Sequence, residues 1–192
     1  MATLILVKHS LPEIVPEAPA SRWRLSAEGR ARCAPLARAL APYGPDRFVA
    51  SAEPKARETA EIVAGLLDKP VSTAEGLHEH DRDNVPYYET AGEFEAAVAA
   101  LFAAPDRLIF GRETVGEARA RFTAAVEATL ARYPRDNVAI VAHGTVIALF
   151  VAACAGIAPH PFWRRLGLPS FVVLSLPERR VLATVSRIGA TD

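Results

Sequence analysis

Two short apolar runs, each with a histidine just beyond its end, constrain the fold more than any other feature of this sequence. Leu4 to Val7 carries no polar residue, and Asn137 to Ala142 carries only its first. Both runs are too short for helices and are typical of strands buried on both faces of a sheet. His9 and His143 follow these runs within one residue. Because open α/β sheets bind ligands beyond the carboxyl ends of their strands, we expect the two histidines to share a pocket.

Helix and strand signals alternate along the rest of the chain. We expect helices from a cap at Ser26 to Tyr43 with a bend at Pro35, and over residues 54–67, 114–133 and 146–154. We expect short strands at residues 48–50 and 71–73 and a hairpin of 171–176 with 181–188. The pattern predicts one domain over residues 1–192, a three-layer α/β sandwich with a mostly parallel central sheet and helices on both faces. Residues 78–112 are irregular around one amphipathic helix and predict a cap or lid.

Composition excludes several classes of function. The 192 residues hold 22 basic and 22 acidic side chains, so the composition indicates no basic face for nucleic acid or a membrane surface. The apolar start of the chain is too short for a signal peptide or a membrane span, and two cysteines are too few for a disulfide framework. We therefore expect a cytoplasmic protein whose partner is a small molecule.

Two helix starts could hold an anion. His143-Gly144-Thr145 opens a helix whose free N–H groups can receive a phosphate, and Gly144 lets a ligand approach the backbone closely. Arg57 lies in the first turn of the helix that begins at Pro54, where its guanidinium could hold two phosphate oxygens. The alternative for Arg57 is an ion pair with a glutamate at position 53, 58 or 61 on the helix surface.

Five blocks, in order, resemble those of the histidine phosphatase superfamily, the phosphoglycerate mutase-like proteins. They are the strand with Lys8-His9-Ser10, the helix block Ser51-Ala-Glu-Pro-Lys-Ala-Arg57-Glu-Thr-Ala60, then Leu77-His-Glu79, Gly111-Arg-Glu-Thr114, and the strand with His143-Gly144. The resemblance spans nearly the whole chain.

The resemblance implies hydrolysis of a small phosphorylated metabolite through a phosphohistidine, with neither a metal nor another cofactor. His9 would be the nucleophile, and His143 and Arg57 would hold the phosphoryl group together with Lys8, Ser10 and Gly144. Glu79 would give the leaving oxygen its proton, with Asp81 as the second candidate for that role. A neutral imidazole suits this chemistry because its ordinary pKa is about 6.5.

The first block departs from the family, which has Arg-His-Gly where this chain has Lys8-His9-Ser10. Lysine holds a phosphate as a point charge but cannot form arginine's planar fork. Only three of the 22 basic residues are lysines, which makes Lys8 noteworthy. Ser10 lacks the backbone freedom of glycine and adds a hydroxyl that could bind a phosphate oxygen. The family's residues after the acid are also replaced, by residues 81–86, so no substrate contacts carry over there.

Three alternatives stay open at this stage. His78 and His80 have the spacing of a metal-ligand pair. Lys8 and Ser10 could mark a protein that binds phosphate esters without turning them over. A mutase is the third alternative, although family mutases tend to be longer, and the segment 78–112 could serve as its lid.

Further residues could line the pocket rim or a subunit contact. The rim candidates are Arg22, Trp23, Arg24, Arg82, Tyr87, Tyr88, Arg107 and Arg112, and each is equally explained as a surface or core residue. Phe162 and Trp163 could pack in the core or at a contact between subunits, and a homodimer is one assembly that the sequence allows.

Overall fold

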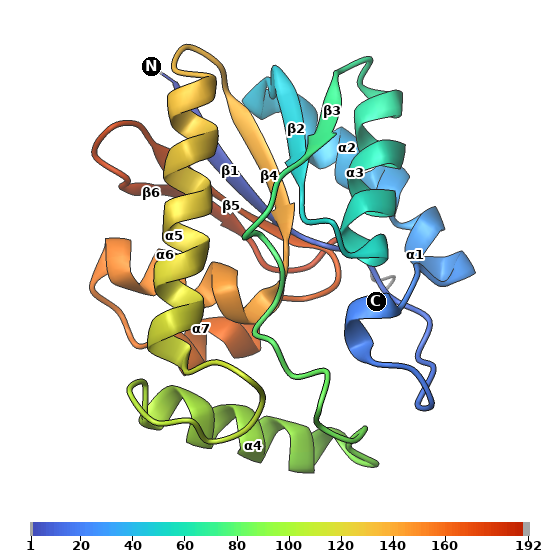
Figure 1. Ribbon diagram of the computed structural model, residues 1–192. Coiled ribbons are helices and arrows are strands. Elements are labelled where there is room, and N and C mark those ends of the chain that lie inside the picture. The colour runs from blue at the N-terminus through green and yellow to red at the C-terminus, as the bar shows by residue number, and fades with distance from the viewer. Residues whose placement is uncertain (1, 190–192) are drawn as a thin grey trace.

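The computed structural model describes residues 2–189 and contains one six-stranded sheet with helices on both of its faces (Figure 1). The strand order is β3-β2-β4-β1-β5-β6. The strands are β1 (Thr3–Lys8), β2 (Arg47–Ala50), β3 (Val71–Thr73), β4 (Val138–Ala142), β5 (Ser170–Ser175) and β6 (Val181–Val185). The first four are mutually parallel, whereas β5 runs antiparallel to both of its neighbours.

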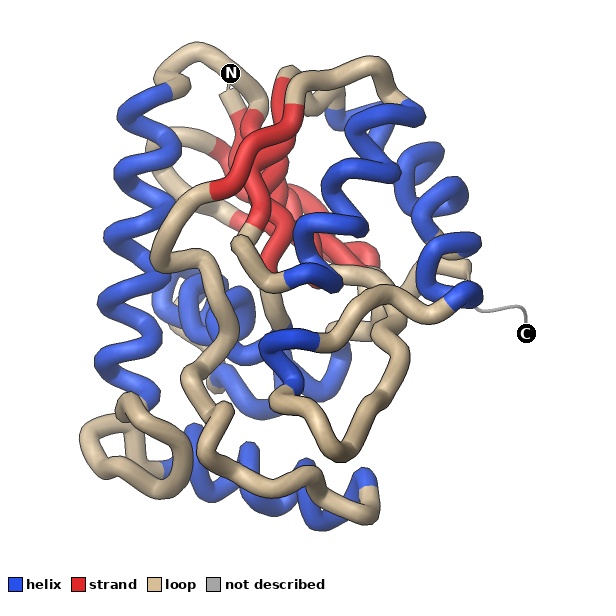
Figure 2. Tube along the Cα trace, turned by 45° about the vertical axis from the view of Figure 1, so that its right-hand side comes forward, coloured by secondary structure: helices blue, strands red, loops and turns tan. Residues whose placement is uncertain are grey.

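The two faces of the sheet bury separate hydrophobic cores, because successive side chains of a strand point to opposite faces. Leu4 and Leu6 contribute to the core beneath α4 (Ala91–Ala103), α5 (Val115–Arg132), α6 (Gly144–Ala155) and α7 (Pro159–Arg165). Ile5 and Val7 contribute to the core beneath α1 (Ala27–Ala31), α2 (Cys33–Leu40) and α3 (Pro54–Leu66). In Figure 2 the strands lie between these two groups of helices. The predicted three-layer α/β sandwich with a mostly parallel sheet is therefore confirmed.

Most predicted elements lie within a few residues of the observed ones, and the local signals explain why. The side chain of Ser26 accepts a hydrogen bond from the N–H of Gly29, as a helix cap should. The helix then breaks between α1 and α2 at Arg32 rather than at Pro35 itself, because proline's ring clashes with the carbonyl one turn earlier. The short helix α7 was missing from the sequence prediction.

The register of β1 against β4 places the catalytic candidates. Lys8 pairs with Ala142, and the N–H of His9 donates to the carbonyl of Ala142 at 3.0 Å. Two adjacent parallel strands therefore end side by side, and the residue after each is a histidine. This confirms the expectation that His9 and His143 share one edge of the sheet.

The segment predicted as a lid contains α4, which packs on α7 below the sheet in Figure 1. Phe94 of α4 meets Trp163 of α7 edge to face at 5.9 Å between ring centroids, so Trp163 belongs to the packing between these helices. Within residues 2–189, no helix combines the length and the apolar character needed to cross a membrane.

Candidate active site

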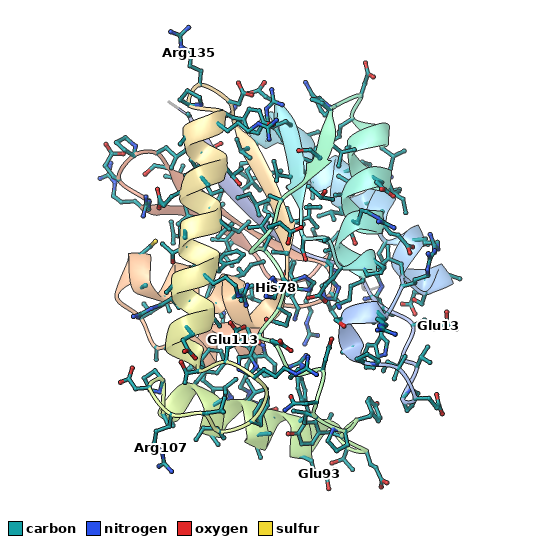
Figure 3. All side chains as sticks on the ribbon, viewed as in Figure 1. Glu13, His78, Glu93, Arg107, Glu113 and Arg135 are labelled. Atoms are coloured by element: carbon teal, nitrogen blue, oxygen red, sulfur yellow. The ribbon has the colours of Figure 1, made fainter. Side chains whose placement is uncertain are left out.

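The pocket at the carboxyl ends of the strands has a volume of about 220 Å³ and contains both histidines. Its other lining residues are Ala20, Ser21, Glu53, Lys55, His78, Glu79, His80, Asp81, Arg82 and Asp83. Four of these are acidic, and two are lysine or arginine, so acidic side chains outnumber these two basic ones in the lining. Figure 3 labels His78 beside the end of the sheet and Glu113 at the foot of α5.

The ring of His9 is held in one tautomer by its own backbone. Its Nδ1 lies 2.7 Å from the carbonyl oxygen of Ser10, and because a carbonyl only accepts, Nδ1 carries the proton and Nε2 keeps its lone pair. Burial, together with the neighbouring His143 ring and the charge of Lys55, lowers the pKa of His9 well below its ordinary value. His9 is therefore a neutral imidazole with a free nucleophilic nitrogen at physiological pH.

His143 lies against His9, with ring centroids 5.2 Å apart and the rings in an edge arrangement. Its Nε2 is 2.9 Å from the hydroxyl of Ser51 and 3.5 Å from a carboxylate oxygen of Glu53. Burial and the charge of Lys55 lower its pKa well below the ordinary value, although Glu79 opposes this. The second histidine is thus also neutral and can donate or accept a hydrogen bond, but it adds no full positive charge.

Glu79 is in the pocket, as predicted, but its carboxylate also caps α6. It accepts hydrogen bonds from the N–H groups of Thr145 at 3.0 Å and Val146 at 3.3 Å. Burial raises the pKa of this carboxyl, and the opposing effects of Arg82, His143 and these backbone donors outweigh it, so the pKa lies below its ordinary value. The N–H groups of Thr145 and Val146, at the helix start where the sequence predicted a phosphate, therefore hold the protein's own glutamate instead.

A clamp of two side chains holds the loop that carries Glu79. The guanidinium of Arg121 on α5 donates to the backbone carbonyls of Gly76, His78 and Glu79 at 2.8 to 3.1 Å. It also pairs with Glu113 at 2.5 Å, and Glu113 accepts the N–H of Asp81 at 3.0 Å. Sequence reasoning missed this Arg121–Glu113 clamp, because the loop carbonyls that Arg121 binds lie 42 to 45 residues before it in the chain.

Gly111 allows the segment that carries Glu113 to approach the loop that carries Glu79 and Asp81. Its φ is +86°, and a Cβ there would lie 2.3 Å from the carbonyl oxygen of Asp81. Any larger residue would therefore push the segment away from the loop. His80 is enclosed by residues on either side of Gly111. Its Nε2 lies 2.8 Å from the carbonyl oxygen of Glu113, and its ring packs on Phe110.

The metal-ligand alternative for His78 and His80 does not match this arrangement, since Nε2 of His80 is committed to a backbone carbonyl. Across residues 2–189, no three histidine, cysteine or acidic side chains are grouped so that they could hold a metal ion.

The placement predicted for Arg57 is wrong. Its side chain is 44% exposed and pairs with Glu61 at 3.6 Å on the outer face of α3, which is one of the surface pairings that the sequence allowed. Lys55, two residues earlier, is buried and lines the pocket instead. Residues two positions apart in an α-helix point about 200° apart around its axis, so Lys55 and Arg57 cannot face the same pocket. The scarcity of lysine, which singled out Lys8, would equally have singled out Lys55.

Three further residues that the sequence predicted to bind phosphate, Lys8, Ser10 and Gly144, do not line the pocket. The ammonium of Lys8 donates to the carbonyl of Leu166 at 2.7 Å. The hydroxyl of Ser10 is buried and donates to the carbonyl of Gly29 at 2.7 Å. At Gly144, an added Cβ would lie 3.1 Å from Cε of Lys8, so the missing side chain makes room for that lysine rather than for a ligand.

Of the eight rim candidates, only Arg82 lines the pocket. Its guanidinium carbon lies 4.8 Å above the ring of Phe94 on α4, an arrangement that attracts a cation to the ring. Arg82 therefore connects α4 to the pocket, and its charge lowers the pKa of both Glu79 and His143.

Comparisons with known proteins agree with this geometry. A family model described as the histidine phosphatase superfamily (branch 1) matches residues 7–186. No curated protein matches the chain.

Several solved structures share the fold at low sequence identity. A mycobacterial protein called hydrolase 2 has a TM-score of 0.76 at 19% identity and covers 99% of this chain and 93% of its own. A mycobacterial glucosyl-3-phosphoglycerate phosphatase has a TM-score of 0.69 at 22% identity, with coverage of 90% and 89%. A phosphoserine phosphatase from Entamoeba histolytica, solved with 3-phosphoglyceric acid, has a TM-score of 0.74 at 17% identity, with coverage of 100% and 98%.

Proposed function

The chain belongs to the histidine phosphatase superfamily and is a phosphatase of that family, and from this we propose that it hydrolyses small phosphate monoesters through a phosphohistidine on His9. The observation that carries the proposal is the paired, neutral histidines at the ends of β1 and β4, with Nε2 of His9 left nucleophilic.

The reaction has two steps. The lone pair on Nε2 of His9 attacks phosphorus, the new N–P bond forms, and the bond to the ester oxygen breaks with both electrons going to the leaving group. Water then attacks phosphorus, the N–P bond breaks with its electrons returning to Nε2, and the Glu79 carboxylate accepts the proton of the water as inorganic phosphate is released. No metal ion takes part in this scheme.

Lys55, Arg82 and His143 hold the phosphoryl group in this proposal. Lys55 and Arg82 are the two permanent cations of the lining, and His143 supplies a neutral hydrogen-bonding group beside the nucleophile. Phosphoryl transfer depends on positioning and on charge stabilisation of the transferring oxygens. Lys55 thus replaces Arg57 in the role inferred from the sequence.

Glu79 is the proposed proton donor, with Asp81, which also lines the pocket, as the alternative. In the free protein the lowered pKa of Glu79 keeps it ionised. A bound phosphoryl group places negative charge beside the carboxylate and favours its protonated form. The donor therefore receives its proton when the substrate binds and passes it to the leaving oxygen.

We also retain three proposals that come from the sequence alone. The protein acts in the cytoplasm on a small-molecule phosphate ester, it does not use nucleic acid or membranes as partners, and a homodimer is its candidate assembly.

The test is phosphate release from an aryl phosphate with a chelator present. The wild type should release phosphate, and His9→Ala should abolish release while unfolding at the same temperature as the wild type. Lys55→Met should raise KM, whereas Arg57→Met, two residues away on the same helix, should not. Undiminished release by His9→Ala would refute the phosphohistidine route, and a chelator-sensitive reaction would refute its independence of metals.

A further inference from the structure

Glu53 places a carboxylate inside the pocket, beside a lysine that a bound phosphate would contact. It is the N-cap residue of α3, yet its side chain makes no capping hydrogen bond to that helix. The side chain turns into the pocket instead and is only 10% exposed. Its position therefore needs an explanation other than helix capping.

The Glu53 carboxylate holds groups that a phosphate would use. One oxygen pairs with Nζ of Lys55. The other accepts the N–H of Glu79 at 2.8 Å and lies 3.5 Å from Nε2 of His143. Lys55 also donates to the carbonyl of Ala20 at 2.6 Å, so two of the three hydrogens of its ammonium are engaged in the free protein.

The charge balance of the pocket makes this contact consequential. Lys55 and Arg82 face four acidic side chains, at positions 53, 79, 81 and 83, while the lowered pKa values of His9 and His143 keep both rings neutral. A phosphate dianion that bound beside an ionised Glu53 would meet two cations already balanced by carboxylates. Phosphate and carboxylate are ligands of the same kind for an ammonium group, so the two compete for Lys55.

We propose that Glu53 is an internal competitor of phosphate, and that phosphate esters bind by displacing its carboxylate from Lys55. This inference rests on the proposed function, because it concerns the same pocket. It makes Glu53 a determinant of affinity: the site holds inorganic phosphate weakly, and contacts with the leaving group decide which esters bind. Weak retention of phosphate also favours release of the product.

The test measures binding of inorganic phosphate by calorimetry in a His9→Ala background, where no turnover intervenes. Glu53→Gln keeps the shape of the side chain and an oxygen for the N–H of Glu79 but removes the charge. It should tighten phosphate binding at least about tenfold, since one unit charge is removed within a few ångströms of the ligand in a poorly solvated site. Asp83→Asn is the matched control, because it removes one charge from the same lining without touching Lys55, and it should change affinity less than about threefold.

Unchanged or weaker phosphate binding in Glu53→Gln would overturn the inference, and so would an equal gain in Asp83→Asn, which would indicate a general charge effect. Aryl phosphate hydrolysis by Glu53→Gln with His9 intact separates this failure from that of the proposed function. Hydrolysis without a gain in affinity refutes only the competitor role. Absence of both binding and hydrolysis in the wild type and the variant refutes both proposals.

Discussion

Lys8 should make the stability of the protein depend on pH in a way that a single substitution can isolate. Its ammonium lies against Gly144, where a Cβ would come within 3.2 Å of Nζ, and donates to the carbonyl of Leu166. Burial lowers the pKa of Lys8 from 10.5 to about 8, against an opposing effect of Glu79. The folded protein therefore carries the cost of a poorly hydrated charge at neutral pH.

The sign and size of the effect follow from the two pKa values. Between pH 8 and 10.5 the unfolded chain binds the Lys8 proton more fully than the folded protein, so the free energy of unfolding rises with pH over this window. Below pH 8 both states are protonated and the cost is constant. Between pH 7 and pH 10 the wild type should gain about 2.5 kcal/mol relative to a variant without this amine.

Lys8→Met supplies that variant, because methionine fills similar space without an ionisable group. Urea unfolding of both proteins at pH 7 and pH 10, under reducing conditions, gives the difference between them at each pH and cancels the titration of every other group. The variant's stability relative to the wild type should fall by about 2.5 kcal/mol between the two pH values. Lys69→Met, at an exposed lysine, should show no such change. A difference that stays constant for Lys8→Met would refute the buried position of its ammonium.

Two further predictions concern the clamp and the nucleophile. Arg121→Met should lower the free energy of unfolding by about 3 kcal/mol and reduce kcat, because Glu79 loses its support; thermal unfolding and aryl phosphate kinetics would show this, with the exposed Arg119→Met as a control that should change neither. The lowered pKa of His9 predicts that kcat/KM falls with acid only as pH drops through a value below 6.5, where the nucleophile becomes protonated; a pH profile with an acid midpoint at or above 6.5 would contradict it.

Features that depend on local sequence and strand topology were predictable. His9 and His143 follow adjacent parallel strands, so the rule that such strands end at one edge was sufficient to bring them together. Ser26 and Thr114 cap helices as their residue types suggest. Glu79 was placed in the pocket by family resemblance, although its capping of α6 was not foreseen.

The predictions that were wrong share a different cause: the local sequence does not show in which direction a side chain points. Arg57 has the better chemistry for phosphate, but the phase of α3 turns Lys55 inward instead. Lys8 and Ser10 flank the nucleophile His9, yet their side chains donate to backbone carbonyls outside the pocket, at Leu166 and Gly29 respectively. These carbonyls are remote in sequence, so no local pattern indicates them.

The Arg121–Glu113 clamp gives the loop that carries Glu79 a support that does not involve α4. The loop bearing Glu79 is fastened to α5, whereas α4 rests on α7 through aromatic and ion-pair contacts such as Arg164 with Glu95. Residues 84–110 do not line the pocket, and α4 is connected to it by the contact of Phe94 with Arg82. A substitution at Phe94 should therefore act on the pocket through the position of Arg82, while the loop of Glu79 stays anchored to α5.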